Sequence, residues 1–344
     1  MKANMTGPVA DPGSVQHEEK TAPAGAMQRR TLLAASGTLL ASPAIAAFPE
    51  RPVRIIVPWS PGALLDVVTR AIAQAMSATL GQSVIVENRP GATGAVGAEA
   101  VARATPDGST LVAANAETHA INPLLYRRLP YDAVRDFTPV CLFTRAPFAL
   151  VAGPSRGFTS LQALIDAAKA KPGAVSFASW GAGSTSRLTM ELLLRDRGIE
   201  MLHVPFVAQA PAITAVMGGQ VDAMFLTAGG GEAAARDGKV KVLAVSSAQR
   251  IPLLPQTPTL RESGIPVEGG NWFALMGPAR MPAEVARRLA EATAEAMQNP
   301  SVLEVCRVQA ADPITGTPEE LASFIAEDRA RWAEVINALK LQLD

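Results

Sequence analysis

The chain has 344 residues, enough for two domains with cores of their own. Hydrophobic residues make up 48% of it and charged residues 18%, with a formal net charge of zero; this excludes a disordered chain and argues against a nucleic-acid partner, which requires a basic surface. Aromatic residues make up 5%, too few for platforms on which bases stack.

The N-terminus carries a predicted export signal. Arg29 and Arg30 form a twin-arginine pair before the apolar stretch 32–47, which contains the A-x-A cleavage pattern Ala44-Ile45-Ala46. Ser and Pro interrupt this stretch, which disfavours a membrane-spanning helix. We therefore expect residues 1–47 to be an extension with a cleavable, Tat-like signal peptide, cut near Ala46, and a periplasmic mature protein. Sec export and a start at Met27 stay open as alternatives.

The two cysteines, Cys141 and Cys306, lie among apolar neighbours, and their spacing fits no metal or redox motif. We expect two buried free thiols, although export leaves a disulfide open as an alternative. A metal site at His119 is disfavoured, because only His203 remains as a second histidine in the mature chain. No cofactor is expected.

Strands and helices are predicted to alternate from Arg51 onward, which indicates a parallel sheet covered by helices. The first series has strands at 53–59, 83–88 and 109–115, with helices at 63–80 and 93–104. The second series has strands at 148–154, 174–180, 201–206, 221–228 and 240–247, with helices at 160–173, 185–198 and 210–220.

A Pro-rich, loop-like stretch at 251–269 follows, and helices at 283–298 and 318–340 close the chain. Thr317 and Glu320 fit a capping box at the start of the last helix. The two series predict an α/β protein of two domains, in which the chain crosses between lobes near 137–151 and returns near 271–278. The predicted lobes are residues 48–145 with 273–344 (lobe 1) and residues 146–272 (lobe 2), with a ligand cleft between them that a hinge can close.

Long stretches of the chain match one pattern, among them SVIVENRPGATGAVGAEAVARATPDGSTL, THAINPLLYRRLPYDAVRDFTPV and LAVSSAQRIPLLPQTPTLRESGIP. From about Phe48 to the C-terminus, their order and spacing resemble the Bug family of periplasmic receptors, the TctC-type solute-binding proteins linked to tripartite tricarboxylate transporters. The resemblance implies a type II periplasmic-binding-protein fold. It also implies a small carboxylate-bearing solute in the interdomain cleft, transporter subunits as membrane partners, and no catalysis.

The resemblance places one side of the site in the turn before the helix at 63–80. Backbone N–H groups at a helix start can meet a carboxylate. Asp66 is either a ligand contact or a structural brace, and the brace is favoured. Leu64 and Leu65 replace small polar residues of the family; core packing is one interpretation of them, and an apolar wall in the cleft is the other. The candidates here are Gly62, Ala63, Leu64, Leu65 and Asp66.

The segment 115–122 supplies two more candidates, Thr118 as a hydroxyl donor and Asn122, which together with His119 is expected to brace the loop. Glu117 stands where the family usually has Gly. If it faces the cleft, it would repel a simple anion and favour a ligand with a donor or a cation. The alternative is a solvated Glu at the loop edge.

The matching loop of the second series starts the helix at 185–198, where Ser184 and Thr185 suit both N-capping and ligand binding. Arg187 replaces the usual His and either clamps a carboxylate or faces solvent. Trp180 is either a stacking wall or packing. The candidates here are Trp180, Gly181, Gly183, Ser184, Thr185 and Arg187.

A further candidate, Phe206, stands where the family has Tyr, and Val207 and Ala208 replace Lys and Gly. Together with Leu226 and Thr227, these departures predict a more apolar pocket, for an aromatic or branched carboxylate. The sequence carries no G-x-S-x-G or H-E-x-x-H motif and no Cys–His spacing of a hydrolase, so an enzyme is a remote alternative. A receptor that docks on a sensor kinase instead of a transporter stays open, and a monomer is expected.

Overall fold

The computed structural model describes residues 48–343, and these belong to one compact unit. The predicted export signal, including the cleavage pattern near Ala46, lies outside the described residues. No helix between residues 48 and 343 is both long and apolar enough to cross a membrane.

The first predicted series is confirmed. Strand β1 (Val53–Val57) pairs in parallel with β2 (Val84–Asn88) on one side and β3 (Thr110–Asn115) on the other. Helix α1 (Leu64–Leu80) ends at Gly81, which has the left-handed φ of 66° that glycine adopts at low cost. Helix α2 (Ala95–Ala102) follows β2. β3 is buried along its whole length, which fits its continuous apolar sequence.

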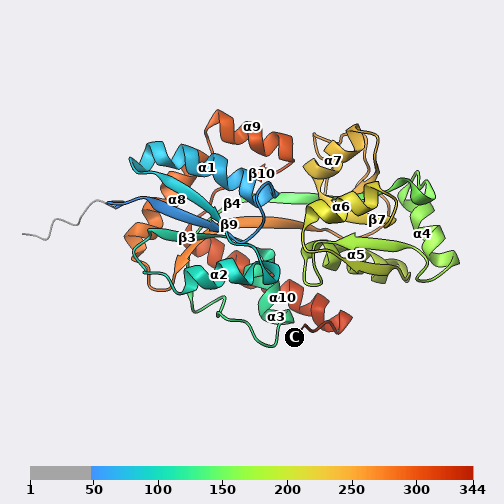
Figure 1. The fold of residues 1–344 in the computed structure, drawn as a ribbon, viewed down its shortest axis with the longest axis horizontal. Helices are drawn as coiled ribbons and strands as arrows, with labels where there is room; N and C mark the ends of the chain where they lie inside the picture. The colour runs from blue at the N-terminus through green and yellow to red at the C-terminus, as the bar shows by residue number, and fades with distance from the viewer. Residues whose placement is uncertain (1–47, 344) are drawn as a thin grey trace, which may run out of the picture. The chain divides into compact units, whose positions relative to one another are not determined.

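Two long strands carry the predicted crossings. Strand β4 (Phe137–Ala152) and strand β9 (Gly270–Pro278) pair antiparallel from Phe137–Pro278 to Pro147–Gly270. Figure 1 shows both strands running from the part of the fold around α1 and α8 to the part around α5, α6 and α7. The division of the chain into the two lobes given above stays a prediction.

The second series is confirmed at its predicted positions, and it contains one helix that the sequence did not reveal. Helix α7 (Ala228–Arg236) begins with AGGGEAAAR, and glycine is a poor helix former, so the pattern gave no helix signal. The other elements are α4 (Leu161–Ala170), β5 (Ser176–Ser179), α5 (Thr185–Arg197), β6 (Leu202–Pro205), α6 (Gln209–Met217), β7 (Ala223–Thr227) and β8 (Lys241–Val245).

The prediction of a parallel sheet needs correction. Parallel pairing holds for β1, β2 and β3 and for β5, β6 and β7. However, β9 is antiparallel to both β3 and β4, and β4 is antiparallel to β7 and β8. The physical reason is that β4 and β9 carry the chain across and back, so they run in opposite directions beside strands that helices connect in parallel.

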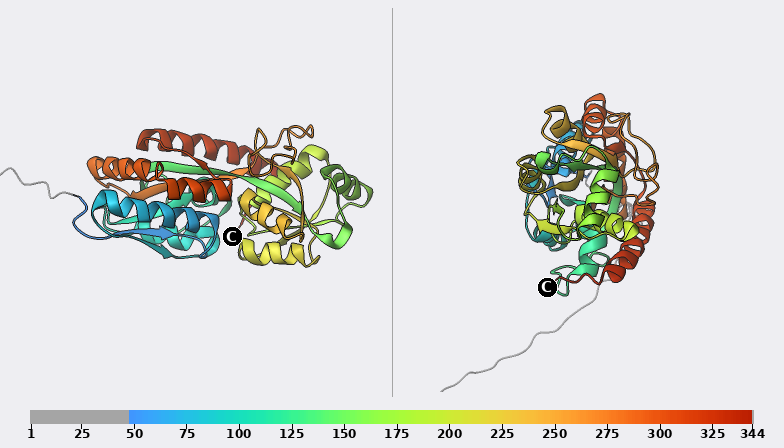
Figure 2. Two further views of the ribbon diagram at one scale, coloured as in Figure 1. Left: turned by 90° about the horizontal axis from the view of Figure 1, so that it is seen from above. Right: turned by 90° about the vertical axis from the view of Figure 1, so that its right-hand side faces the viewer.

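The C-terminal helices pack against the first series, as predicted. Helices α8 (Ala283–Ala296) and α9 (Pro300–Gln309) contact α1, and α10 (Pro318–Leu339) contacts β4 (Figure 2). α9, which the sequence pattern did not reveal, begins at Pro300 and is capped by Asn299, whose side chain accepts from the N–H of Ser301. The capping box of Thr317 and Glu320 is confirmed.

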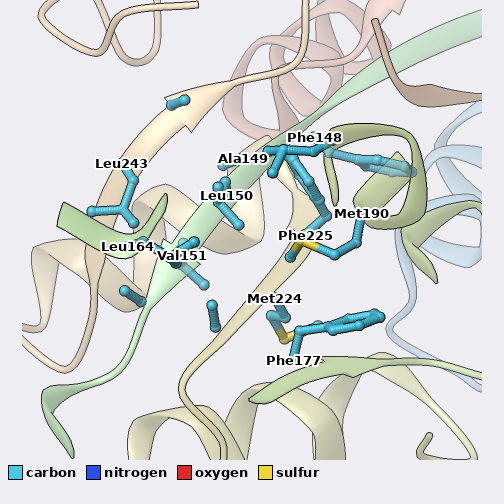
Figure 3. Packing of buried hydrophobic residues seen from close by; sticks show 14 of the residues in the cluster. Phe148, Ala149, Leu150, Val151, Leu164, Phe177, Met190, Met224, Phe225 and Leu243 are labelled. Atoms are coloured by element: carbon cyan, nitrogen blue, oxygen red, sulfur yellow. The ribbon is translucent and has the colours of Figure 1, made fainter. Parts of the chain in front are cut away.

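The apolar core is divided among three clusters. One is built from residues 148–267 and includes Phe148, Phe177 and Phe225 (Figure 3). The other two cover the sheet formed by β1, β3 and β9, and one of them holds both cysteines. Cys141 and Cys306 are free and buried, as predicted, and burial raises the pKa of the Cys141 thiol to about 12, so it is inert at neutral pH.

Candidate functional site

The start of α1 is braced by a carboxylate. Asp66 accepts from the N–H of Gly62 at 2.9 Å, from Asn88 Nδ2 at 2.8 Å and from Arg70 Nε at 3.0 Å. Burial tends to raise the pKa of Asp66, but these hydrogen bonds and the charge of Arg70 outweigh it and hold the pKa below its usual value. The geometry therefore favours the structural brace over ligand contact for this side chain.

The same helix start has backbone N–H groups that meet no acceptor within residues 48–343. The N–H of Ala63 donates to the carbonyl of Ser60 at 3.3 Å. In the described part of the chain, the N–H groups of Leu64 and Leu65 have no protein acceptor, as is usual in the first turn of a helix. Such groups, at the positive end of the helix dipole, can bind an anion.

A cavity of about 70 Å³ lies at this helix start. Leu64 and Leu65 are buried and also line the cavity, as the predicted apolar wall requires. Trp180, another candidate, forms part of the wall and packs edge-on against Phe148. The full lining is Trp59, Ser60, Ala63, Leu64, Leu65, Asn115, Trp180, Ala208, Gln209, Thr227, Asn271 and Phe273.

Six lining residues were not singled out from the sequence: Trp59, Ser60, Asn115, Gln209, Asn271 and Phe273. Each lies at or next to an end of a strand or helix. Only tertiary packing brings these residues together around one cavity. Trp59 and Ser60 directly precede the recognised turn, and Asn115 ends β3, so a rule that includes the flanks of each loop would have found these three.

The start of α5 is capped by its own loop, and the side chain of Glu117 covers it from outside the loop. Ser184 is the N-cap: its hydroxyl accepts from the N–H of Arg187 at 3.3 Å and donates to the carbonyl of Gly181 at 2.8 Å. Thr185 is fully buried. Gly183 lies close to Leu125, since a Cβ there would be 3.1 Å from Leu125 Cδ1.

Glu117 fills the space in front of Thr185. Its carboxylate accepts from Trp180 Nε1 (3.2 Å), Thr185 N (3.1 Å), Thr185 Oγ1 (2.7 Å), Asn115 Nδ2 (2.7 Å) and Asn271 Nδ2 (2.7 Å). The side chain has no solvent exposure, so the alternative of a solvated Glu at the loop edge is wrong. A buried carboxylate has to find donors inside the protein, and five of them converge here.

The polar side chains near Glu117 make hydrogen bonds that stabilise the loop. The hydroxyl of Thr118 lies 2.8 Å from His119 Nδ1 and 3.1 Å from the carbonyl of Asn115, and Asn122 Nδ2 donates to the carbonyl of Thr93 at 2.9 Å. All three side chains are buried, and burial lowers the pKa of His119 to about 3. Among the residues that the structure describes, no group of His, Cys, Asp or Glu is placed to hold a metal ion.

Arg187 and Phe206 lie outside the cavity lining. Arg187 Nη1 donates to the carbonyl of Ala182 at 3.0 Å, and its Nε donates to Glu191 at 3.3 Å. Phe206 packs against the edge of the cluster built from residues 148–267. In this arrangement neither side chain meets the cavity, and a contact with ligand requires that it move.

Comparison with known proteins agrees with this fold. The sequence profile of the family described as tripartite tricarboxylate transporter family receptor (TctC) matches residues 68–341. Protein BugT of Bordetella pertussis is 34% identical over 318 residues, which cover 90% of this chain and 98% of BugT.

Two solved structures are similar throughout. Rpa4515 of R. palustris, solved with adipate, is 31% identical with a TM-score of 0.82, over 86% of this chain and 99% of Rpa4515. MatC (Rpa3494) of Rhodopseudomonas palustris, solved with bound malate, is 32% identical with a TM-score of 0.77, over 84% of this chain and all of MatC, 100%. The chain therefore belongs to the TctC family of tripartite tricarboxylate transporter receptors.

Proposed function

We propose that this protein is a periplasmic receptor that binds a small carboxylate-bearing solute at the start of α1. The observation that carries the proposal is the cavity at a helix N-terminus whose N–H groups on Leu64 and Leu65 have no acceptor in the described residues. Two similar structures contain the carboxylates adipate and malate, which supports the same class of ligand here. Gly62 and Ala63 shape the turn that presents these donors.

The remaining parts of the proposal draw on the family for the transporter partner and on the sequence for the monomeric state and the export signal. The protein hands its solute to the membrane components of a tripartite transporter rather than to a sensor kinase, acts as a monomer and performs no catalysis. A Tat-like signal near Ala46 exports it. Residues 48–145 with 273–344 and residues 146–272 act as two lobes that close on the ligand, and the separate cluster built from residues 148–267 supports this division.

Mass spectrometry of small molecules released by denaturing the purified protein tests the proposal. We expect a bound carboxylic acid, returned chemically unchanged. A thermal-shift panel of carboxylates, amines and sugars provides the second test, since a ligand that binds the folded state raises Tm. Stabilisation by sugars or amines with none by any carboxylate would contradict the proposal.

A further inference from the structure

The buried carboxylate of Glu117 is saturated. A carboxylate has about four lone-pair sites, and the protein already aims five donors at it, from Asn115, Trp180, Thr185 and Asn271. It therefore has no acceptor capacity left for a ligand. This corrects the expectation that a Glu facing the cleft favours a ligand with a donor or a cation.

The donors that Glu117 consumes belong to the wall of the cavity. Asn115, Trp180 and Asn271 all line it, yet the indole N–H of Trp180 and one N–H of each Asn amide are directed to the carboxylate of Glu117, and Asn271 Nδ2 also lies 3.4 Å from Thr185 Oγ1. The amide oxygens of the two Asn residues are engaged as well: Asn115 Oδ1 accepts from the N–H of Thr118, and Asn271 Oδ1 from that of Trp272. These wall residues thus present mainly apolar surface to a ligand.

A second polar pair in the wall is also satisfied internally. Gln209 Nε2 donates to Thr227 Oγ1 at 3.3 Å, and Gln209 Oε1 accepts from the N–H of Thr227 at 3.4 Å. Both residues line the cavity. Because Gln209 Oε1 and one N–H of Gln209 are engaged by Thr227, a ligand can meet only the second N–H of Gln209 and the hydroxyl proton of Thr227 without breaking this pair.

A group of donors without a protein acceptor lies near α1. Within residues 48–343, the hydroxyl of Ser60 and the N–H groups of Leu64 and Leu65 have no protein partner. The indole N–H of Trp59, which also lines the cavity, is buried without an acceptor. Such a donor is costly unless a ligand or water accepts from it.

We propose that Glu117 determines specificity: it takes the place of a ligand carboxylate at the start of α5 and restricts the receptor to monocarboxylates with an apolar body. This inference rests on the proposed function. The ligand places its single carboxylate at the start of α1 and its apolar part against Leu64, Leu65, Trp180 and Phe273. A second carboxylate would meet satisfied donors and a buried negative charge, and its desolvation would be uncompensated.

Matched acids of equal carbon skeleton test this inference: butyrate against succinate, hexanoate against adipate and 4-methylbenzoate against terephthalate, measured by calorimetry. We expect wild-type protein to bind at least one monocarboxylate about tenfold or more tighter than its dicarboxylate, because a charge left without donors is strongly penalised. Glu117→Gly frees the five donors, so its preference for the monocarboxylate should fall by about tenfold or reverse.

Two variants serve as controls. Glu117→Gln keeps the side-chain volume in place, so binding of the dicarboxylates should stay weak. Glu99→Gln removes one negative charge on α2, where Glu99 pairs with Arg103, and should leave the preference at the wild-type value. In Glu117→Gly, acetate should raise Tm more than chloride at equal ionic strength, because acetate can occupy the vacated donors, and more than it does in wild type.

The outcomes separate the inference from the proposed function. Wild-type protein that binds a dicarboxylate as tightly as its monocarboxylate, or a folded Glu117→Gly with the wild-type preference, overturns the inference and leaves the function standing. Absence of binding to any carboxylate in wild type and variants overturns the function. If Glu117→Gly does not fold, the wild-type ratio and the Glu117→Gln ratio still decide, since equal affinity for both acids in either protein contradicts the inference.

Discussion

The starts of α1 and α5 have similar backbone structure but differ in the hydrogen-bond acceptors of their first-turn N–H groups. Each helix follows a strand and a turn of small residues, and each leaves first-turn N–H groups without helix partners. At α5 the N–H of Thr185 donates to Glu117, whereas at α1 the N–H groups of Leu64 and Leu65 meet no acceptor in the described part of the protein. The local backbone presents N–H donors in both places, and a side chain from another element decides whether they stay without an acceptor.

The two acidic residues near these helix starts explain the difference. Asp66 belongs to α1 itself and binds the turn from behind, through Gly62, Asn88 and Arg70, so it leaves the helix end free. Glu117 follows β3 and reaches across to α5, so it covers the helix end. A negative side chain thus supports an anion site in one case and fills it in the other.

The largest effect is expected from Glu117→Leu. Leucine fills the space but cannot accept a hydrogen bond, so the donors on Asn115, Trp180, Thr185 and Asn271 lose their partner. Leaving buried groups unpaired in this way should lower the free energy of unfolding by about 3–5 kcal/mol, measured by urea denaturation. A loss below about 1 kcal/mol would mean that water reaches these donors and that the α5 start is open like that of α1.

The structure around the two helix starts can be predicted in part from the sequence. The elements around both helix starts follow from alternating strand and helix patterns, because α1 and α5 have local signals such as the closing Gly81 and the N-cap Ser184. The role of Glu117 does not follow, since its partners Trp180 and Asn271 are far away in the sequence and meet it only after folding. Helix α7 was not predicted for a local reason, because its three glycines obscure the helical pattern.

The two regions should also differ in their response to acid. His203 lies in β6, with its Nε2 2.7 Å from Ser179 Oγ at the end of β5, and its pKa is lowered from 6.5 to about 4 by burial and by the charge of Arg187. Between these values the unfolded chain binds a proton that the folded chain does not. The contribution of His203 to the free energy of unfolding is therefore fully present above pH 6.5 and is lost as the pH falls toward 4.

His203→Gln should reduce that pH slope by less than one proton, below about 1.4 kcal/mol per pH unit because solvent screens a half-buried group, in urea unfolding curves recorded at several pH values. Asp66→Asn is the matched variant for the α1 region. Because the pKa of Asp66 is lowered below 3.8, its contribution is lost only as the pH falls below that value, and the slope at higher pH should stay as in wild type. An unchanged slope in His203→Gln would show that this histidine is protonated alike in both states.

Asp66→Ala tests the brace at α1. The change removes the acceptor of the Gly62 N–H and of two side-chain donors, Arg70 and Asn88, and should cost about 2 kcal/mol in urea unfolding. It should also weaken ligand binding in calorimetry, because the turn that presents the Leu64 and Leu65 N–H groups loses its anchor. Arg103→Ala is the control on α2, where an exposed ion pair with Glu99 is lost and neither quantity should change by more than about 0.5 kcal/mol. Unaltered affinity in Asp66→Ala would place the ligand away from this turn.

The smallest effect is expected from Gly62→Ala, which separates stability from binding at the turn itself. Gly62 has φ of 81°, and an added Cβ would meet no atom within 4 Å, so the cost is that of the left-handed backbone, about 1 kcal/mol. Gly198 after α5 has φ of 60° and equally open surroundings, so Gly198→Ala should lose about the same stability. Only Gly62→Ala should weaken the binding of a carboxylate, since its turn leads directly into the open N–H groups. Equal affinity in both variants would indicate that the α1 turn tolerates backbone strain without moving those donors, or that the carboxylate lies elsewhere, and the Asp66→Ala result distinguishes the two.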